Sequence, residues 1–278
     1  MVNILFKKSY LHKFLTPLPF DDLWGTKGVF TTIRVVGCPP KFILLDEHIR
    51  NLNISLKKFG INFILTHQHM NELIHTSIHN NTNYDHLFRI AINSKKISIS
   101  LRSHVQPNKF FTATIVNYQR ANPLLKNLYY KKIISLLENN NNSNNEVILT
   151  KNDIILEGCT TNILCVRMKK IYMPLTNYYK GMTLKYIVNK SRKKIIKRNI
   201  LVKDLSLYEE ILLLGSGKGV VNISAIPDIN WKKQSDSIYK ETLSLYKKLI
   251  KIYATKHSYI YIFLPLDNGN LQCHKGFF

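Results

Sequence analysis

Acidic residues are scarce in this 278-residue chain: 17 Asp and Glu stand against 40 Lys and Arg, a formal net charge of +23. An excess of this size raises the question of a nucleic-acid partner. The cations are scattered between apolar residues, however, and the densest run, at 190–198, is typical of the exposed face of a helix. We therefore do not expect nucleic acid to be the ligand.

The chain also lacks closely spaced cysteines and long apolar runs. None of its four cysteines lies in a Cys-x-x-Cys pair, which argues against a zinc ribbon or disulfide framework and favours a reducing compartment. No apolar run approaches the ~18–20 residues of a membrane span. Pro17 and Pro19 interrupt the basic N-terminus, so no secretory signal is predicted. We expect a cytoplasmic protein without a membrane partner; a short organelle-targeting segment stays open.

A group of histidines invites a metal interpretation, at positions 67, 69, 75 and 79. The last two would share a helix face. No carboxylate or cysteine completes a metal-ligand spacing around them. We therefore predict no metal site.

The apolar pattern of the first half predicts an α+β unit with an antiparallel sheet. Strands are expected at 29–36, 42–45 and 110–118, a hairpin at 87–92 and 97–101, and helices from 46 and over about 64–78. We expect this unit to form a smaller N-terminal α/β sandwich over residues 1–116, followed by a linker at 117–122.

The second half predicts a larger, barrel-like α/β domain over residues 123–278. Its expected elements are a helix from Pro123, an Asn-rich loop at 138–145, buried strands on both sides of 157–162, a helix over 184–198, a strand at 211–214, a long amphipathic helix over 236–254 and a closing hairpin over 259–273. A small-molecule site is expected in the cleft between the two domains.

Lys126 would lie in the first turn of the helix that begins at Pro123, with Asn122 as its cap. Apolar neighbours and the positive end of the helix dipole would lower the pKa of its ammonium group. A desolvated lysine is a candidate Schiff-base nucleophile. Position alone leaves open that Lys126 is an ordinary exposed lysine.

Glu157 stands at a tight polar corner between two apolar segments that resemble buried strands. A carboxylate in such a place is costly unless a cation meets it. The sequence around the corner therefore predicts a cationic partner for Glu157.

Six segments in this order resemble the fold-type IV, or class IV aminotransferase-like, pyridoxal-phosphate enzymes. They are Gly28-Val-Phe-x-Thr32-Ile-Arg34, Leu45-x-x-His48-Ile, Arg120-x-x-Pro123-x-x-Lys126-Asn127-x-Tyr129, Glu157-Gly-x-x-Thr161-Asn162-Ile, Gly181-Met-Thr183 and Glu210-Ile-Leu-Leu-Leu-Gly-Ser216-x-x-Gly219. The resemblance covers residues from about 20 to 230. The family includes branched-chain aminotransferases, D-amino-acid aminotransferases and 4-amino-4-deoxychorismate lyases, and its members are usually homodimers.

The resemblance implies that Lys126 holds pyridoxal 5'-phosphate as a Schiff base and that Glu157 takes the N–H of the pyridinium ring. A carboxylate there keeps the ring protonated, so that the ring can act as an electron sink. Thr161 and Asn162 would form walls of the pocket. The phosphate would bind to backbone N–H groups at Met182, Thr183, Gly215, Ser216 and Gly217.

Three positions depart from the family pattern. Asn51 stands where the family places a phosphate-binding arginine, which leaves Arg50 or another cation for that role. Leu184 replaces the arginine of a Gly-Ile-Thr-Arg turn, and Thr31 replaces a glutamate. The Schiff-base lysine and the ring carboxylate are both retained, so we expect catalysis to survive.

The branch of the family is indicated by Phe30-Thr31-Thr32, which leans toward the lyases. In an aminodeoxychorismate lyase, Lys126 would abstract the ring proton, and Lys126 or Thr32 would donate a proton as pyruvate leaves. The substrate is a small dicarboxylate anion; Phe30, Lys27, Arg34 and Arg102 are candidates for contacting it. Two alternatives stay open: an aminotransferase with the same Lys126 and Glu157, and a basic nucleic-acid-binding protein on a degenerate enzyme fold.

Overall fold

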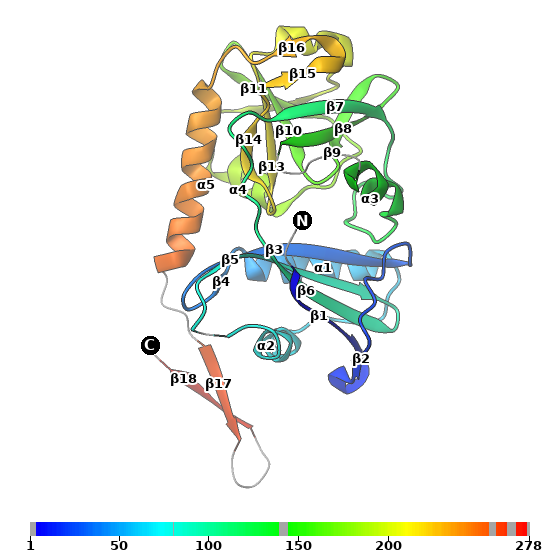
Figure 1. The fold of residues 1–278 in the computed structure, drawn as a ribbon, viewed down its shortest axis with the longest axis vertical. Coiled ribbons are helices and arrows are strands. Elements are labelled where there is room, and N and C mark those ends of the chain that lie inside the picture. The colour runs from blue at the N-terminus through cyan, green and yellow to red at the C-terminus, as the bar shows by residue number, and fades with distance from the viewer. Residues whose placement is uncertain (1–3, 80, 139–143, 256–259, 266–270, 277–278) are drawn as a thin grey trace.

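The computed structural model describes residues 4–79, 81–138, 144–255, 260–265 and 271–276. Figure 1 shows a mixed α/β fold in two layers of sheet, with the N-terminal sheet below the C-terminal strands. The long helix α5 (Ser237–Thr255) runs down one side and contacts both β13 and β3. The predicted two-part α/β architecture is confirmed.

The N-terminal half folds into a six-stranded antiparallel sheet in the order β2-β1-β6-β5-β3-β4. These strands are β1 (Ile4–Leu11), β2 (Pro17–Leu18), β3 (Gly28–Gly37), β4 (Lys41–Phe42), β5 (Tyr84–Asn93) and β6 (Lys96–Ser103). The β5–β6 hairpin was predicted. Helices α1 (Leu45–Lys58) and α2 (His67–His75) cover one face and share its apolar core.

The alternation of side chains along β3 decides which of its residues face the C-terminal domain. Successive residues of a strand point to opposite faces. Ile33 and Val35 join the core under α1, whereas Phe30 packs against Leu128 and Tyr130 on the other side. Phe30, Thr32 and Arg34 therefore share the face of the sheet that meets the C-terminal domain.

The C-terminal half is built from two five-stranded sheets, in the orders β12-β11-β10-β13-β14 and β16-β15-β7-β8-β9. Their apolar side chains form one shared core. The strands are β7 (Thr112–Asn117), β8 (Asn145–Lys151), β9 (Ile154–Gly158), β10 (Asn162–Arg167), β11 (Lys170–Pro174), β12 (Ile195–Arg198), β13 (Glu210–Gly215), β14 (Gly219–Asn222), β15 (Ala225–Ile226) and β16 (Trp231–Lys232).

Two helices complete this half beside α5: α3 (Lys131–Glu138) packs against β8, and α4 (Met182–Lys190) packs against β13 and α5. Three short 3₁₀ turns lie at Lys13–Leu15, Val202–Leu207 and Pro227–Ile229. The predicted closing hairpin is present as β17 (Ile260–Pro265) and β18 (Leu271–Gly276), although its turn and most of the Asn-rich loop lie outside the described residues. Within the described residues, no helix has the length and apolar character of a membrane span.

The helix predicted from Pro123 is wrong: residues 121–130 form an irregular turn, and α3 begins only at Lys131. Asn122 has a φ of 47°, whereas a helix N-cap needs an extended backbone. The Asn127 side chain closes the turn by donating hydrogen bonds to the backbone carbonyls of Ala121, Asn122 and Leu125.

Two further expectations differ from the structure. The helix predicted over 184–198 ends at Lys190, and 195–198 is instead the edge strand β12, parallel to β11. The basic run at 190–198 is therefore not one helix face. Strand β7, expected beside the N-terminal hairpin, pairs in parallel with β8 in the C-terminal half.

Candidate active site

Lys126 lies on an extended segment that adds to the edge of β3. The Phe30 N–H donates to the Lys126 carbonyl (2.9 Å), and Leu128 N–H donates to the Gly28 carbonyl (2.9 Å). These bonds use the backbone groups that a helix would have needed. They fix Lys126 at the seam between the two domains, with its Nζ 4.9 Å from the centre of the Phe30 ring.

The ammonium group of Lys126 is held in an unfavourable setting. Burial, followed by the charges of Arg120 and Arg89, lowers its pKa from 10.5 to about 8, although Glu157 opposes the shift. The predicted direction is right, and burial, one of the two expected causes, is the largest; the helix dipole drops out because Lys126 precedes α3 and is not in its first turn. A lysine with such a pKa carries a useful fraction of neutral amine near neutral pH.

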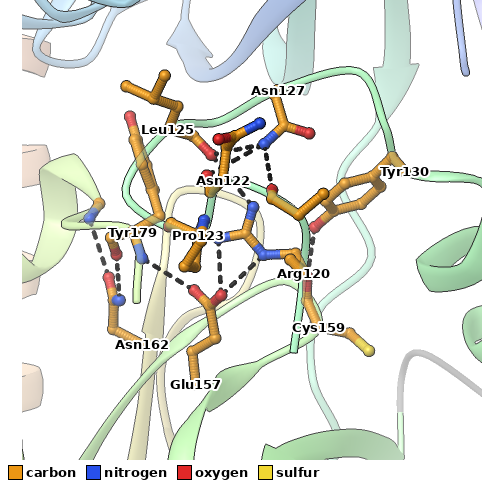
Figure 2. Close-up of polar contacts among 12 residues, drawn as sticks. Arg120, Asn122, Pro123, Leu125, Asn127, Tyr130, Glu157, Cys159, Asn162 and Tyr179 are labelled. Carbon is orange, nitrogen blue, oxygen red and sulfur yellow. Dashed lines mark hydrogen bonds and ion pairs between the residues drawn. The ribbon is translucent and has the colours of Figure 1, made fainter. Parts of the chain in front are cut away.

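Glu157 is almost completely buried, at 4% exposure, at the end of β9. Figure 2 shows its Oε1 accepting a hydrogen bond from the Nε of Arg120 at 2.7 Å and forming an ion pair with the Nη2 of Arg120 at the same distance. Its Oε2 accepts the backbone N–H of Tyr179 at 3.1 Å. The cation that the corner required is therefore present in the chain itself, as Arg120.

Arg120 joins the carboxylate to the lysine segment. Its guanidinium also donates to the carbonyls of Pro123 (3.0 Å) and Leu125 (3.2 Å), so one side chain holds both Glu157 and the turn before Lys126 (Figure 2). Burial raises the pKa of Glu157, and Arg120 opposes that shift. The ion pair with Arg120 offsets part of the cost of burying this carboxylate.

The polar corner after Glu157 is fixed by its own hydrogen bonds. The hydroxyls of Thr160 and Thr161 donate to the buried Glu146 on β8, at 2.7 and 3.1 Å. Asn162 donates to the Tyr179 carbonyl at 2.5 Å and accepts the Gly181 N–H at 3.0 Å. The corner is thereby tied to the loop before α4.

The start of α4 offers backbone donors. Gly181 is its N-cap and no side chain caps it, so the N–H groups of the first turn have no side-chain partner among the described residues. A Cβ at Gly181 would lie 2.8 Å from Asn162 Oδ1, which leaves no room for a larger residue. Such a helix start is suited to an anion.

These elements enclose one pocket of about 500 Å³, including its open mouth. Its lining contains eight of the predicted site residues: Thr32, Lys126, Glu157, Thr161, Asn162, Met182, Gly215 and Ser216. Residues far apart in the sequence, from β3, the lysine segment, β9, α4 and β13, thus meet at one place.

The other seven predicted residues are not part of this lining, although the Phe30 ring lies beside it, with its centre 4.9 Å from Lys126 Nζ. Thr183 is buried in the first turn of α4, and Gly217 follows Ser216, the last lining residue of its turn. Arg50 is exposed and lines a neighbouring hollow with Asn51 and Lys185. Lys27 is exposed before β3, Arg102 is partly buried at the end of β6, and Arg34 lines a separate cavity.

Several pocket residues were missed by the sequence reasoning. His48 is buried and its Nδ1 lies 2.6 Å from the hydroxyl of Thr31; burial, and then the charges of Lys126 and Lys185, lower its pKa to about 3. Tyr130 donates to the carbonyl of Cys159. Tyr179 acts through its backbone and its side chain: its hydroxyl accepts a hydrogen bond from Asn51 at 2.7 Å, and Lys126 Nζ lies 5.5 Å from the centre of its ring. Arg120 and Glu157, by contrast, have opposite charges, so the sequence could have suggested them as an ion pair.

Comparison with known proteins identifies relatives. The family described as amino-transferase class IV matches residues 28–226. No curated protein matches the chain. The branched-chain aminotransferase of Thermoproteus uzoniensis with norvaline is 18% identical, with a TM-score of 0.73 over 90% of this chain and 96% of that one.

Two further solved structures are similar. The branched-chain amino acid aminotransferase from Thermobaculum terrenum in its PLP form is 14% identical, with a TM-score of 0.70 over 89% of this chain and 94% of that one. A hypothetical aminotransferase from Mycobacterium tuberculosis in its PLP-bound form is 15% identical, with a TM-score of 0.68 over 88% and 99%. At these identities the likeness establishes the fold and not the substrate.

Proposed function

We propose a function from one premise: the chain belongs to the amino-transferase class IV family, and its cofactor is pyridoxal 5'-phosphate. From this premise we infer that it is an aminodeoxychorismate lyase, which converts 4-amino-4-deoxychorismate to 4-aminobenzoate and pyruvate for folate synthesis. The proposal concerns the substrate and the bond that breaks, because the family contains enzymes of several reactions.

The pocket residues fit the cofactor. Lys126 would hold it covalently, Glu157 would meet its ring nitrogen, and the uncapped start of α4 with Gly215 and Ser216 would take its phosphate. Asn51, which replaces the family arginine, accepts a hydrogen bond from Lys185 at 2.9 Å, so a cation is still available beside that end. When bound, the protonated ring supplies an electron sink for a carbanion.

The chain's own groups would move the protons. Lys126, with a pKa of about 8, can be neutral near neutral pH and so can take a proton from the substrate ring. Arg120 and Tyr179 orient Glu157. The substrate ring loses a proton, and the bond between a ring carbon and the oxygen of its three-carbon substituent breaks. The ring becomes aromatic, and the substituent is released as pyruvate.

The lyase proposal rests on a difference between two adjacent threonines: the hydroxyl of Thr31 has a hydrogen-bond partner, and that of Thr32, within the described residues, is free to act. Both line the pocket, but Thr31 is buried and its hydroxyl is engaged by His48 at 2.6 Å. Thr32 lines the pocket with Lys126, and among the described residues its hydroxyl has no side-chain partner. A free hydroxyl beside the lysine suits proton donation to a leaving oxygen, which amino transfer does not require.

The test is release of 4-aminobenzoate and pyruvate from aminodeoxychorismate without an added amino acceptor. Thr32→Val should reduce the lyase rate about 100-fold while the absorbance of bound cofactor is unchanged. Thr114→Val, a half-buried strand threonine outside the pocket, is the matched control. Absence of 4-aminobenzoate with an intact cofactor spectrum would overturn the lyase proposal and leave the family assignment standing.

Amino transfer is the second candidate, favoured by the likeness to solved branched-chain aminotransferases. It predicts that a branched-chain or D-amino acid is consumed only when a 2-oxo acid is supplied. We also propose a cytoplasmic homodimer, as is usual in the family. Sedimentation at micromolar concentration would check the dimer.

A further inference from the structure

A second cavity lies between the two domains and shares no lining residue with the Lys126 pocket. It encloses about 1110 Å³, including its open mouth. Its walls come from β3, the segment at 104–109, the turn into β14, β14 itself and the adjoining face of α5. It is thus formed by the same domain seam as the Lys126 pocket but on the other side of the 215–219 turn.

The charge of this cavity is of one sign. Its lining contains five cations, Arg34, Lys109, Lys218, Lys233 and Lys247, together with His104, and no Asp or Glu. Lys218 and Lys233 have partners behind the wall, in Glu146 (3.2 Å) and Asp236 (2.7 Å). Lys109 and Lys247 are exposed and form no salt bridge within the described residues. A cavity lined by one sign of charge concentrates ions of the opposite sign.

Arg34 gives the second, independent observation. Its side chain is only 9% exposed; one terminal nitrogen pairs with Asp85, and the other, Nη1, is buried without a hydrogen-bond partner. A buried polar group without a partner is costly, and each such group in a folded protein calls for an explanation. A planar guanidinium that already uses one nitrogen keeps its other nitrogens for an oxyanion.

We propose that this cavity is a binding site for a small polyanion that carries at least two carboxylate or phosphate groups. Arg34 supplies the buried contact, and the exposed Lys109, from the 104–109 segment, and Lys247, from α5, meet the other anionic group. Because the cavity and the Lys126 pocket have separate linings, the ligand binds while the cofactor is in place.

The experiment is calorimetric titration of the cofactor-saturated protein with two probes, inorganic pyrophosphate and isophthalate. Saturable binding of one or both supports the site, and the preferred probe decides between a phosphate and a carboxylate ligand. Lys109→Gln/Lys247→Gln should weaken binding at least about tenfold. Lys132→Gln/Lys248→Gln removes the same charge from exposed positions outside the lining and should leave binding unchanged.

Three results would overturn the proposal. These are no saturable binding of either probe, equal weakening by both double variants, and displacement of the cofactor by the probe. The last result would mean that the anion competes for the phosphate end of the Lys126 pocket. Cofactor absorbance recorded during the titration distinguishes it from binding in the second cavity.

Discussion

Glu146 and Glu157 are buried carboxylates on neighbouring strands, β8 and β9, and they differ in their hydrogen-bond partners and in their access to the pocket. Glu146 is fully buried and accepts four hydrogen bonds, from Thr160, Thr161, Lys218 and the backbone of Val147. Glu157 accepts two, one from Arg120 and one from the backbone of Tyr179, pairs with a second nitrogen of Arg120, and lines the pocket.

The difference matters because a carboxylate offers about four acceptor positions. Glu146 is fully buried outside the pocket lining, and its four hydrogen bonds come from other groups of the protein, so its role is to hold the fold together. Glu157 accepts fewer hydrogen bonds and lines the pocket, so its carboxylate can still receive a ring N–H there. Two residues of the same chemistry, on adjacent strands of one sheet, are thus expected to differ in whether their loss affects stability or catalysis.

The largest effect is expected at the lysine that shares the pocket with Glu157. Lys126→Ala should reduce turnover by more than about 10⁴-fold, because the covalent attachment of the cofactor is lost. Borohydride should then no longer fix the cofactor to the protein, as mass spectrometry can show. Lys132→Ala, at an exposed position of α3, is the control; a cofactor still trapped in Lys126→Ala would refute the assignment.

Glu146→Leu should destabilise the fold by about 3–5 kcal/mol, because the largely buried Lys218 loses its counter-ion. Denaturant unfolding measures the loss. Adding Lys218→Met should recover much of it, since the unpaired charge is removed as well. If the single variant unfolds like the wild type but is inactive, the contrast between the two carboxylates is wrong.

Glu157→Gln should show the opposite balance, with turnover reduced about 100-fold or more and a smaller loss of stability than Glu146→Leu. The amide keeps the size of the side chain but cannot hold a ring nitrogen in its protonated form. Steady-state kinetics and the cofactor absorption spectrum are the measurements. Full activity in this variant would remove Glu157 from the site.

A smaller effect concerns the pH dependence of Lys126 in the cofactor-free protein. Its pKa is about 8, so the amine is protonated and unreactive below pH 8 and neutral above it. Acetylation of Lys126 by acetic anhydride should therefore level off above pH 8, whereas an ordinary lysine continues to gain reactivity toward pH 10.5.

The two carboxylates should again differ in this assay. Glu157 raises the pKa of Lys126, so Glu157→Gln should move the midpoint to lower pH. Glu146 is not among the charges that act on Lys126, so Glu146→Gln should leave it in place. Peptide mapping of the acetylated protein gives both midpoints; identical shifts would contradict the separation.

Strongly periodic elements could be predicted from the sequence. The β5–β6 hairpin and the amphipathic α5 agree closely with the structure, because each is defined by its own residues. The turn at 121–130 could not be predicted in this way. Pro123 and the apolar residues after it favour a helix, but hydrogen bonds to β3 and the Asn127 side chain decide against it.

The meeting of Lys126, Glu157 and Thr32 in one pocket could be expected from the sequence, because a motif marks each of them, and their catalytic roles stay predictions. The site was not predictable where partners meet only in three dimensions. Arg120 precedes Glu157 by 37 positions, and its four contacts depend on a turn that no local pattern specifies. The contact of His48 with Thr31 likewise depends on how α1 packs on β3.

The backbone hydrogen bonds that join the Lys126 segment to β3 limit how the two halves of the protein can move. The Leu128 carbonyl accepts a hydrogen bond from the Gly25 N–H (2.7 Å), and the Leu128 N–H donates to the Gly28 carbonyl (2.9 Å). The Phe30 N–H donates to the Lys126 carbonyl (2.9 Å). A Cβ at Gly28 would lie 2.6 Å from Leu128 Cδ1, so the two segments are in close contact as well as paired. The two halves of the protein therefore cannot separate near Lys126 without breaking these backbone hydrogen bonds. The amides of Phe30 and Leu128 should be among the slowest to exchange with deuterium, and small molecules should enter through movements of side chains at the mouth.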